Sequence, residues 1–198
     1  MNEERIEPAL VRLFLAVELT AETRAALARA QGRLRQERAR VGWMAAENLH
    51  ITMAFLGDTE PTKVEPMQTA LDAVGRTVAP FSCRIEGLGN FGSPRAPRVI
   101  WAGVSAGAEP LTRLQAGIAA AVAQQGLALE EREFHAHVTL GRVRSARDAG
   151  TLLAAMEALQ ARAFGDVPVN RFVLMRSELL PEGPRYAVLH PVPLLATT

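Results

Sequence analysis

The sequence has little of several residue types, and each shortage excludes a class of protein. Cys83 is the only cysteine among the 198 residues, so neither an intrachain disulfide nor a cluster of thiolate metal ligands can form. An excess of one charge is also missing, because the chain has 22 basic and 21 acidic residues and a net charge of +1. The chain is therefore not a uniformly basic nucleic-acid coating protein, and any RNA or DNA would be held by a local patch.

Long hydrophobic runs are absent as well. No segment approaches the ~20 apolar residues of a membrane helix, and the charged N-terminal stretch lacks the apolar core of a secretory signal. We therefore expect a cytoplasmic protein that does not enter a membrane. Lysine is almost missing too, since Lys63 is the only one and arginine carries the remaining positive charge. Arginine suits phosphate recognition, because its planar fork donates two parallel hydrogen bonds.

What remains is the composition of a globular protein, with 48% apolar and 22% charged residues. Strand-like and helix-like segments alternate along the chain. Apolar runs predict strands over 13–18, 49–56, 81–87, 99–104, 134–143, 172–179 and 186–194. Apolar residues at three- and four-residue spacing predict helices over 20–38, 64–78, 111–122 and 145–159. The Gly- and Pro-rich stretch 87–98 is expected to be a loop.

Two of the predicted strands carry the same pattern. One reads HITMAF from His50, and the other reads HVTLGR from His137. Each of them lies between two predicted helices, which indicates an internal duplication with one His-x-Thr motif in each of two similar lobes. We therefore expect residues 1–198 to form a single bilobal domain.

Strand geometry places the histidine and the threonine of each motif on one face. Side chains alternate along a strand, so His50 and Thr52 point the same way, as do His137 and Thr139. The apolar residues between them face the core, and the same alternation assigns Phe55 to the apolar face. Each lobe thus presents one imidazole and one hydroxyl on the side of its strand that faces away from the core.

Two imidazoles that face one cleft suit a reaction that removes a proton at one place and donates a proton at another. Imidazole titrates near neutral pH, so one ring can act as base while the other acts as acid. The two threonine hydroxyls could hold the non-bridging oxygens of one phosphate between the rings. Phosphodiester hydrolysis needs this arrangement, with the attacking and leaving oxygens on opposite sides. One such strand alone would more simply be structural, whereas the matched pair indicates function.

These segments together resemble the two-histidine (2H) phosphoesterases, above all their LigT-like branch, the RNA 2′,3′-cyclic phosphodiesterases or 2′-5′ RNA ligases. The similarity extends over about residues 11–193. It rests on the run 43–57 around the first motif, the run 134–142 around the second, and the Ser-Glu-Leu of 177–179. Further matches are Phe14, Gly87, Phe91, Arg98, Trp101, Pro181, Gly183 and Tyr186.

The resemblance implies an α+β fold, in which two antiparallel-rich β-sheets line a central cleft and the helices lie outside. It implies that His50 is the proton donor to the leaving 3′ oxygen and that His137 is the proton acceptor that activates water. Thr52 and Thr139 would bind the phosphate. The product would be an RNA end with a 2′-phosphate, and a reversible ligation, with an RNA 5′-hydroxyl replacing water, would give a 2′-5′ linkage. No metal and no cofactor is implied.

Three further residues are candidates for the site. The resemblance implies that Arg142 binds phosphate, although simple alternation places it opposite His137 unless a bulge or the strand end intervenes; a surface or inter-lobe ion pair is the alternative. Trp43, in a predicted loop, is a candidate for substrate contact at the cleft rim. His135 departs from the family pattern, as does Ala136 in place of the usual proline. It could contact the phosphate or the RNA backbone, or lie at the solvated start of the strand.

Three functions stay open on the sequence. The main hypothesis is metal-independent hydrolysis of RNA 2′,3′-cyclic phosphate ends, with such an RNA or a cyclic nucleotide as the partner. The alternatives are a 2H phosphoesterase of small cyclic nucleotide phosphates and a non-catalytic RNA- or nucleotide-binding module on the same fold. The intact pair of motifs favours an enzyme, because binding alone does not need two proton-transfer groups. We expect a monomer without an obligate protein partner.

Overall fold

The computed structural model describes residues 9–93, 95–129, 133–145, 147, 149–181 and 183–195. Within these ranges the chain forms nine β-strands and four α-helices. The strands are β1 Val11–Glu18, β2 Val41–Trp43, β3 His50–Thr59, β4 Phe81–Ser93, β5 Ala96–Ala106, β6 His137–Val143, β7 Ala163–Val169, β8 Arg171–Leu180 and β9 Gly183–Pro193. The helices are α1 Ala21–Leu34, α2 Val64–Gly75, α3 Ala108–Gln124 and α4 Ala149–Glu157, with short 3-10 turns at Ala46–Asn48 and Pro61–Lys63.

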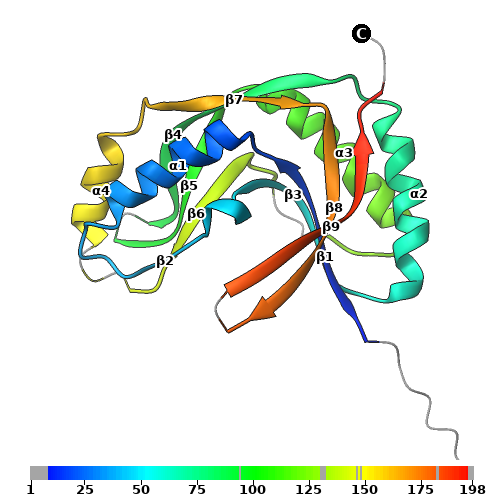
Figure 1. The fold of residues 1–198 in the computed structure, drawn as a ribbon, viewed down its shortest axis with the longest axis horizontal. Coiled ribbons are helices and arrows are strands. Elements are labelled where there is room, and N and C mark those ends of the chain that lie inside the picture. The colour runs from blue at the N-terminus through cyan, green and yellow to red at the C-terminus, as the bar shows by residue number, and fades with distance from the viewer. Residues whose placement is uncertain are drawn as a thin grey trace, which may run out of the picture.

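The strands form one curled antiparallel sheet in the order β7-β4-β5-β6-β3-β1-β8-β9, and β2 pairs with β6 beside this path (Figure 1). The two halves of the sheet meet where β3 pairs with β6, through the single pair Ile51 and Val138. The predicted α+β class is therefore confirmed. The two expected sheets correspond to the two halves of this one sheet, which stay connected because β3 and β6 pair near the start of each strand.

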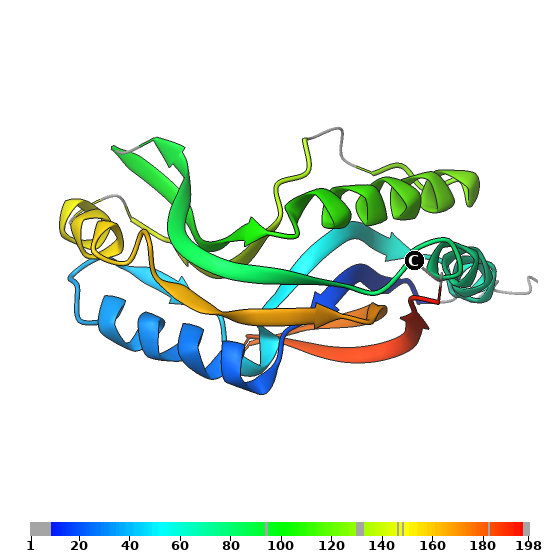
Figure 2. The ribbon, with the colours of Figure 1, turned by 90° about the horizontal axis from the view of Figure 1, so that it is seen from above.

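The helices cover the sheet from several sides. Figure 2 shows α1 (blue) and α3 (green) on opposite long sides of the curled sheet, while α2 and α4 lie at its two ends. α1 begins at Thr20, whose hydroxyl accepts a hydrogen bond from the amide of Thr23 and caps the helix. Apolar residues at helical spacing turn inward, including Met67 and Leu71 of α2 and Leu114 of α3, all fully buried. A second, small apolar cluster of Phe14, Ala16 and Val173 lies apart from the main core.

Most predicted elements are present, and the differences have local causes. The stretch 87–98 is not a loop in its described part: β4 continues to Ser93 and β5 begins at Ala96. Its glycines sit at irregular points of the hairpin, where Gly87 and Gly92 have positive φ angles of 73° and 104°. The helix expected to reach residue 38 ends at Leu34, and the short strands β2 and β7 were not predicted.

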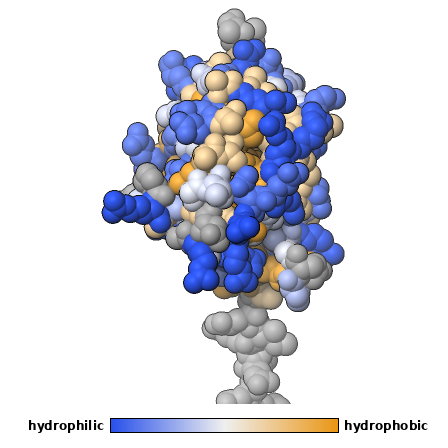
Figure 3. Space-filling model, turned by 90° about the vertical axis from the view of Figure 1, so that its left-hand side faces the viewer, coloured by the Kyte–Doolittle hydropathy of each residue, from blue (hydrophilic) through white to orange (hydrophobic). Residues whose placement is uncertain are grey.

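The surface is mixed in polarity. Figure 3 views the left-hand end of the molecule in Figure 1, where hydrophilic side chains surround a narrower band of apolar ones. Single large apolar side chains are exposed elsewhere, such as Leu179 and Val188 on the β8–β9 hairpin. In the described part of the chain, no helix combines the length and the hydropathy that crossing a bilayer requires.

Candidate active site

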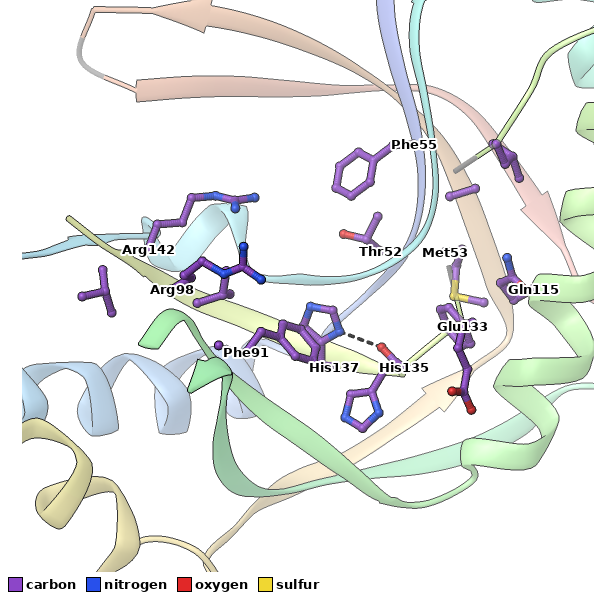
Figure 4. Close-up of a pocket in the computed structure, with 16 residues that line it drawn as sticks. Thr52, Met53, Phe55, Phe91, Arg98, Gln115, Glu133, His135, His137 and Arg142 are labelled. Carbon is purple, nitrogen blue, oxygen red and sulfur yellow. Dashed lines mark hydrogen bonds between the residues drawn. The ribbon is translucent and has the colours of Figure 1, made fainter. Parts of the chain in front are cut away.

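A cleft of about 910 Å³ opens over the sheet, and β3, β4, β5 and β6 all contribute to its walls (Figure 4). Sites for small ligands have volumes of roughly 300–1,000 Å³, so this cleft can hold a nucleotide. Four of the predicted site residues line it: Thr52, His135, His137 and Arg142. The other two residues of the motifs, His50 and Thr139, are half-buried on the same two strands.

The two His-x-Thr strands meet at the middle residue of each motif, where Ile51 pairs with Val138. Both of these side chains are fully buried, as the alternation predicted. In an antiparallel pair, the residues that flank such a pair lie across from each other in reverse order. The histidine of each motif therefore lies across from the threonine of the other, and a two-fold arrangement of imidazoles and hydroxyls results.

Hydrogen bonds and aromatic rings fix the orientation of His50. Its Nδ1–H donates to the carbonyl oxygen of Asn48 at 2.7 Å, and its Nε2 lies 3.0 Å from the hydroxyl of Thr52. The rings of Phe14 and Tyr186 pack against the imidazole, with centroids 5.0 and 5.6 Å away. Phe14 comes from β1 and Tyr186 from β9, so three strands hold this one side chain in place.

His137 is held in the same way. Its Nδ1–H donates to the carbonyl oxygen of His135 at 2.6 Å, and the ring of Phe91 packs edge-on at 4.9 Å. In both motifs the acceptor is thus the carbonyl two residues before the histidine. A carbonyl oxygen can only accept, so each neutral ring carries its proton on Nδ1 and leaves Nε2 as the acceptor. Two nitrogens able to take or give a proton are therefore available for chemistry.

Burial lowers the pKa of both histidines below the ordinary 6.5. The hydrogen bond to Asn48 opposes this for His50, while the charge of His137 lowers the pKa of His50 further. For His137 the carbonyl of His135 raises the pKa, and the charges of His135 and Arg142 lower it. This lowering of both pKa values favours the neutral form of each ring at pH 7. An anion bound between them would favour protonation, because opposite charges stabilise each other.

A β-bulge turns Arg142 into the cleft. The pairing of β6 with β5 skips Leu140, so that Leu140 and the following Gly141 both face the interior. The alternation resumes one residue late, and Arg142 lies on the face of His137 and Thr139. The sequence analysis named a bulge as one way for Arg142 to reach the face of His137, and this bulge is present.

The same irregularity occurs in the first motif. The pairing of β3 with β1 skips Met53, which again is the third residue after the histidine. Met53 and Ala54 are both buried, and Phe55 is 61% exposed and lines the cleft. The prediction that Phe55 faces the core was therefore wrong, because it assumed an unbroken alternation. The two strands share a bulge at equivalent positions as well as a sequence pattern.

The model of the 2′-5′ RNA ligase superfamily matches residues 16–179. The chain belongs to this superfamily. An RNA 2′,3′-cyclic phosphodiesterase of Methanothermobacter thermautotrophicus is 35% identical over 176 residues, which make up 89% of this chain and 95% of that protein. The match confirms the family that the sequence pattern indicated.

Solved structures of related proteins have the same fold. The crystal structure of a Thermus thermophilus protein superposes with a TM-score of 0.78 at 32% identity, over 94% of this chain and 100% of that one. LigT of Escherichia coli in complex with 3′-AMP superposes with a TM-score of 0.73 at 26% identity, over 94% and 98%. The LigT-like fold that the resemblance implied is therefore confirmed.

In this member of the 2′-5′ RNA ligase superfamily, Gln31 of α1 supports the bulge in β6. Its side chain is 3% exposed, and its Nε2 donates to the carbonyl oxygens of Met44 and Leu140, both at 2.9 Å. The amide of Met44 also donates to Leu140. Leu140 is the extra residue of the bulge, so these two donors satisfy a buried carbonyl that the strand ladder leaves out. Nothing in the local sequence indicates this role of Gln31.

Trp43 lies in β2 and not in the expected loop. Its ring is half-buried, packs beside Gly141, and has the guanidinium of Arg35 at 5.8 Å from the ring centroid. It is not among the described residues that line the cleft. Substrate contact by Trp43 therefore stays a prediction, and its observed contacts are with the back of the bulge.

His135 precedes β6, is exposed, and lines the cleft. Its ring packs against Trp101 and Phe91 with centroid distances of 5.0 and 5.6 Å, and lies 6.1 Å from the ring of His137. Among the described residues, no three or more His, Cys, Asp or Glu side chains come together as a set of metal ligands. His135 thus joins the aromatic wall that supports the second histidine.

Proposed function

We propose that this protein hydrolyses the 2′,3′-cyclic phosphate at the end of an RNA chain to a 2′-phosphate. The observation that carries the proposal is the antiparallel meeting of the two His-x-Thr strands, each with an imidazole anchored through Nδ1, beside the cleft that His137 lines. The name of the Methanothermobacter relative, RNA 2′,3′-cyclic phosphodiesterase, supports this substrate. The crystal structure of E. coli LigT complexed with 3′-AMP supports a cleft that accepts a nucleotide.

In the proposed reaction His137 acts as base and His50 as acid. Nε2 of His137 takes a proton from water as the water oxygen attacks phosphorus. The bond between phosphorus and the 3′ oxygen breaks, and Nε2–H of His50 gives its proton to that oxygen. A 2′-phosphomonoester and a free 3′-hydroxyl result. When an RNA 5′-hydroxyl takes the place of water as the attacking group, the same step yields a 2′-5′ linkage.

The remaining site residues stabilise charge in this mechanism. The hydroxyls of Thr52 and Thr139 donate to the non-bridging oxygens, whose charge grows in the transition state. Arg142, turned inward by its bulge, adds a positive charge beside them. The bound anion also raises the pKa of His50, which the acid needs because burial in the empty cleft keeps that ring neutral.

Beside this function we propose three further properties that the sequence led us to expect. They are a single bilobal domain made of two duplicated lobes, a monomeric state, and a cytoplasmic location. The bulge shared by β3 and β6 supports the duplication, because a local irregularity at equivalent positions is an unusual coincidence in unrelated strands. For the role of RNA as partner, the arginines on the cleft wall are the supporting feature.

The test uses a short RNA that ends in a 2′,3′-cyclic phosphate, and 2′,3′-cyclic mononucleotides, both in the presence of EDTA. Phosphorus NMR should show conversion of the RNA end to a 2′-phosphate. His50→Ala and His137→Ala should each lower kcat by about 10²–10⁴, the usual contribution of a general acid or base. His190→Ala is the matched control, because His190 bonds to Asp72 at 2.8 Å and lies outside the cleft lining.

Each outcome decides between the functions. Turnover of mononucleotides alone would favour a phosphoesterase of small cyclic phosphates. Binding of the RNA without any turnover would favour a binding module. If His50→Ala and His137→Ala both kept the rate of the unchanged protein, the two-histidine mechanism would be wrong. Loss of activity in EDTA with recovery on adding a divalent metal would contradict the metal-independent reaction.

A further inference from the structure

The cleft has a concentration of positive charge apart from the two histidines. Arg98 and Arg142 lie next to each other toward one end, and Figure 4 shows both side chains extending into the cleft. They come from neighbouring strands, because Val99 of β5 pairs with Arg142 of β6. Glu133, the one carboxylate among the described lining residues, lies toward the opposite end of the view. The cleft is therefore cationic at one end and acidic at the other.

Arg98 reaches the cleft through a bulge of its own. The pairing of β5 with β4 joins Phe91 to Val99 and Gly92 to Pro97, and so skips Arg98. Arg98 and Val99 both line the cleft as a result, whereas strict alternation would send one of them to the other face. Bulges commonly re-aim a side chain next to a site, and this one adds a guanidinium that the two motifs do not include.

Neither Arg98 nor Arg142 forms an ion pair with a carboxylate in the part of the chain that the structure describes. Both side chains are exposed, so water and salt reduce their mutual repulsion. Two like charges on adjacent strands are nevertheless unfavourable without a counter-charge. An anion with more than one negative group would relieve this repulsion and contact both guanidinium groups.

We propose that Arg98 binds the phosphodiester on the 5′ side of the terminal nucleotide, so that the RNA chain leaves the cleft past Arg98. This inference rests on the proposed function. An RNA end with a 2′,3′-cyclic phosphate has only one connection to the rest of the chain, through its 5′ oxygen. With the cyclic phosphate between the histidines, the next phosphate is attracted to the cationic end and repelled from Glu133. The subsite would make the protein prefer RNA over a mononucleotide.

The test compares a dinucleotide that ends in a 2′,3′-cyclic phosphate with a 2′,3′-cyclic mononucleotide that has no 5′-phosphate. Arg98→Ala should lower the ratio of their kcat/KM values about tenfold, mainly through KM of the dinucleotide, because one charge-assisted contact is lost. The slope of log KM against log salt concentration for the dinucleotide should fall by about 0.7, the contribution of one phosphate contact on a single strand. A loss of folding would not change this slope.

Arg29→Ala is the matched control, because Arg29 is exposed on α1 and is not part of the cleft lining. It should leave both the ratio and the slope as in the unchanged protein. An unchanged ratio and slope in Arg98→Ala would overturn the subsite while the proposed function stands. If the unchanged protein hydrolysed neither substrate, the proposed function would fail. The subsite would then be decided by fluorescence anisotropy with an RNA ending in a 2′-phosphate, where equal Kd values for both proteins would refute it.

Discussion

The carbonyl oxygens of Asn48 and His135 decide which nitrogen of each histidine can react. Each accepts the Nδ1–H of the histidine two residues later, at 2.7 and 2.6 Å. The sequence predicted that His50 lies on the same strand face as Thr52, because a period of two along a strand depends only on counting residues. It did not predict the carbonyl contacts, because they depend on how the chain bends just before each strand.

The pH profile of kcat/KM should reach its maximum below pH 6.5. The proposed reaction needs one ring protonated and one neutral, and this form is most abundant midway between the two pKa values. Burial lowers the pKa of both His50 and His137 from 6.5 in the free protein, so the midpoint lies below 6.5. The profile of kcat should peak at higher pH, because bound phosphate raises both pKa values. A kcat/KM maximum above pH 7 would contradict this assignment.

Gln31→Met should lower the free energy of unfolding by about 1–3 kcal/mol. The substitution keeps the side-chain volume but removes both hydrogen bonds to buried carbonyls, and this range is the usual cost of an unsatisfied buried group. KM should also rise, because the bulge that directs Arg142 loses a support. Urea denaturation and steady-state kinetics measure the two effects. Gln36→Met, at an exposed position after α1, is the control and should change stability by less than about 0.5 kcal/mol.

At the scale of strands, the bulges explain where prediction from sequence succeeded and where it failed. Alternation correctly placed the residues up to the third position after each histidine. Beyond that position it placed Phe55 in the core, where the structure exposes it, and left the side of Arg142 undecided. A bulge is a property of two strands in register, so one strand's own residues do not contain it. The strands over 81–87 and 99–104 were predicted, but their extension into the expected loop 87–98 was not, because bulges accommodate the glycines there.

Gly141→Ala should destabilise the protein by about 1–3 kcal/mol, because the added methyl group would come within 2.7 Å of Val41 and 3.1 Å of the Trp43 ring. The clash would push β2 away from β6 just behind Arg142. Gly150→Ala in α4 offers the opposite case, since no atom lies within 4 Å of the added carbon. That change should stabilise by about 0.4–1 kcal/mol. Thermal and urea unfolding of the two variants would show whether their effects have opposite signs, and equal effects would contradict the packing argument.

At the scale of the whole molecule, segments far apart in sequence complete each half of the sheet. β1 lies between β3 and β8, and β7 extends the other half by pairing with β4. The residues of β8 and β9 also fill the core, with Phe172, Leu174 and Val192 fully buried. The sequence indicated two lobes. It did not indicate that β8 pairs with β1 or that β7 pairs with β4, because strand order depends on long-range pairing that no local pattern encodes.

A chain that ends at Asn170 should not fold cooperatively. It would lose the side chains of Phe172, Val173, Leu174 and Val192, each of which contributes about 1.5–3 kcal/mol when fully buried. Their sum is comparable to the roughly 5–15 kcal/mol that separates a folded domain from its unfolded state. Near-ultraviolet circular dichroism and thermal melting would test this expectation. A sharp melting transition in the shortened chain would show that β8 and β9 are dispensable.

The place of β1 has a consequence for biosynthesis. A ribosome makes β1 long before it makes β8, although the two are neighbours in the finished sheet. During most of translation β1 can pair with β3, but its other edge has no partner. Open strand edges recruit foreign strands, so the nascent chain needs either a chaperone or rapid completion to avoid association. The final steps of folding must therefore wait until residues 171–180 have left the exit tunnel.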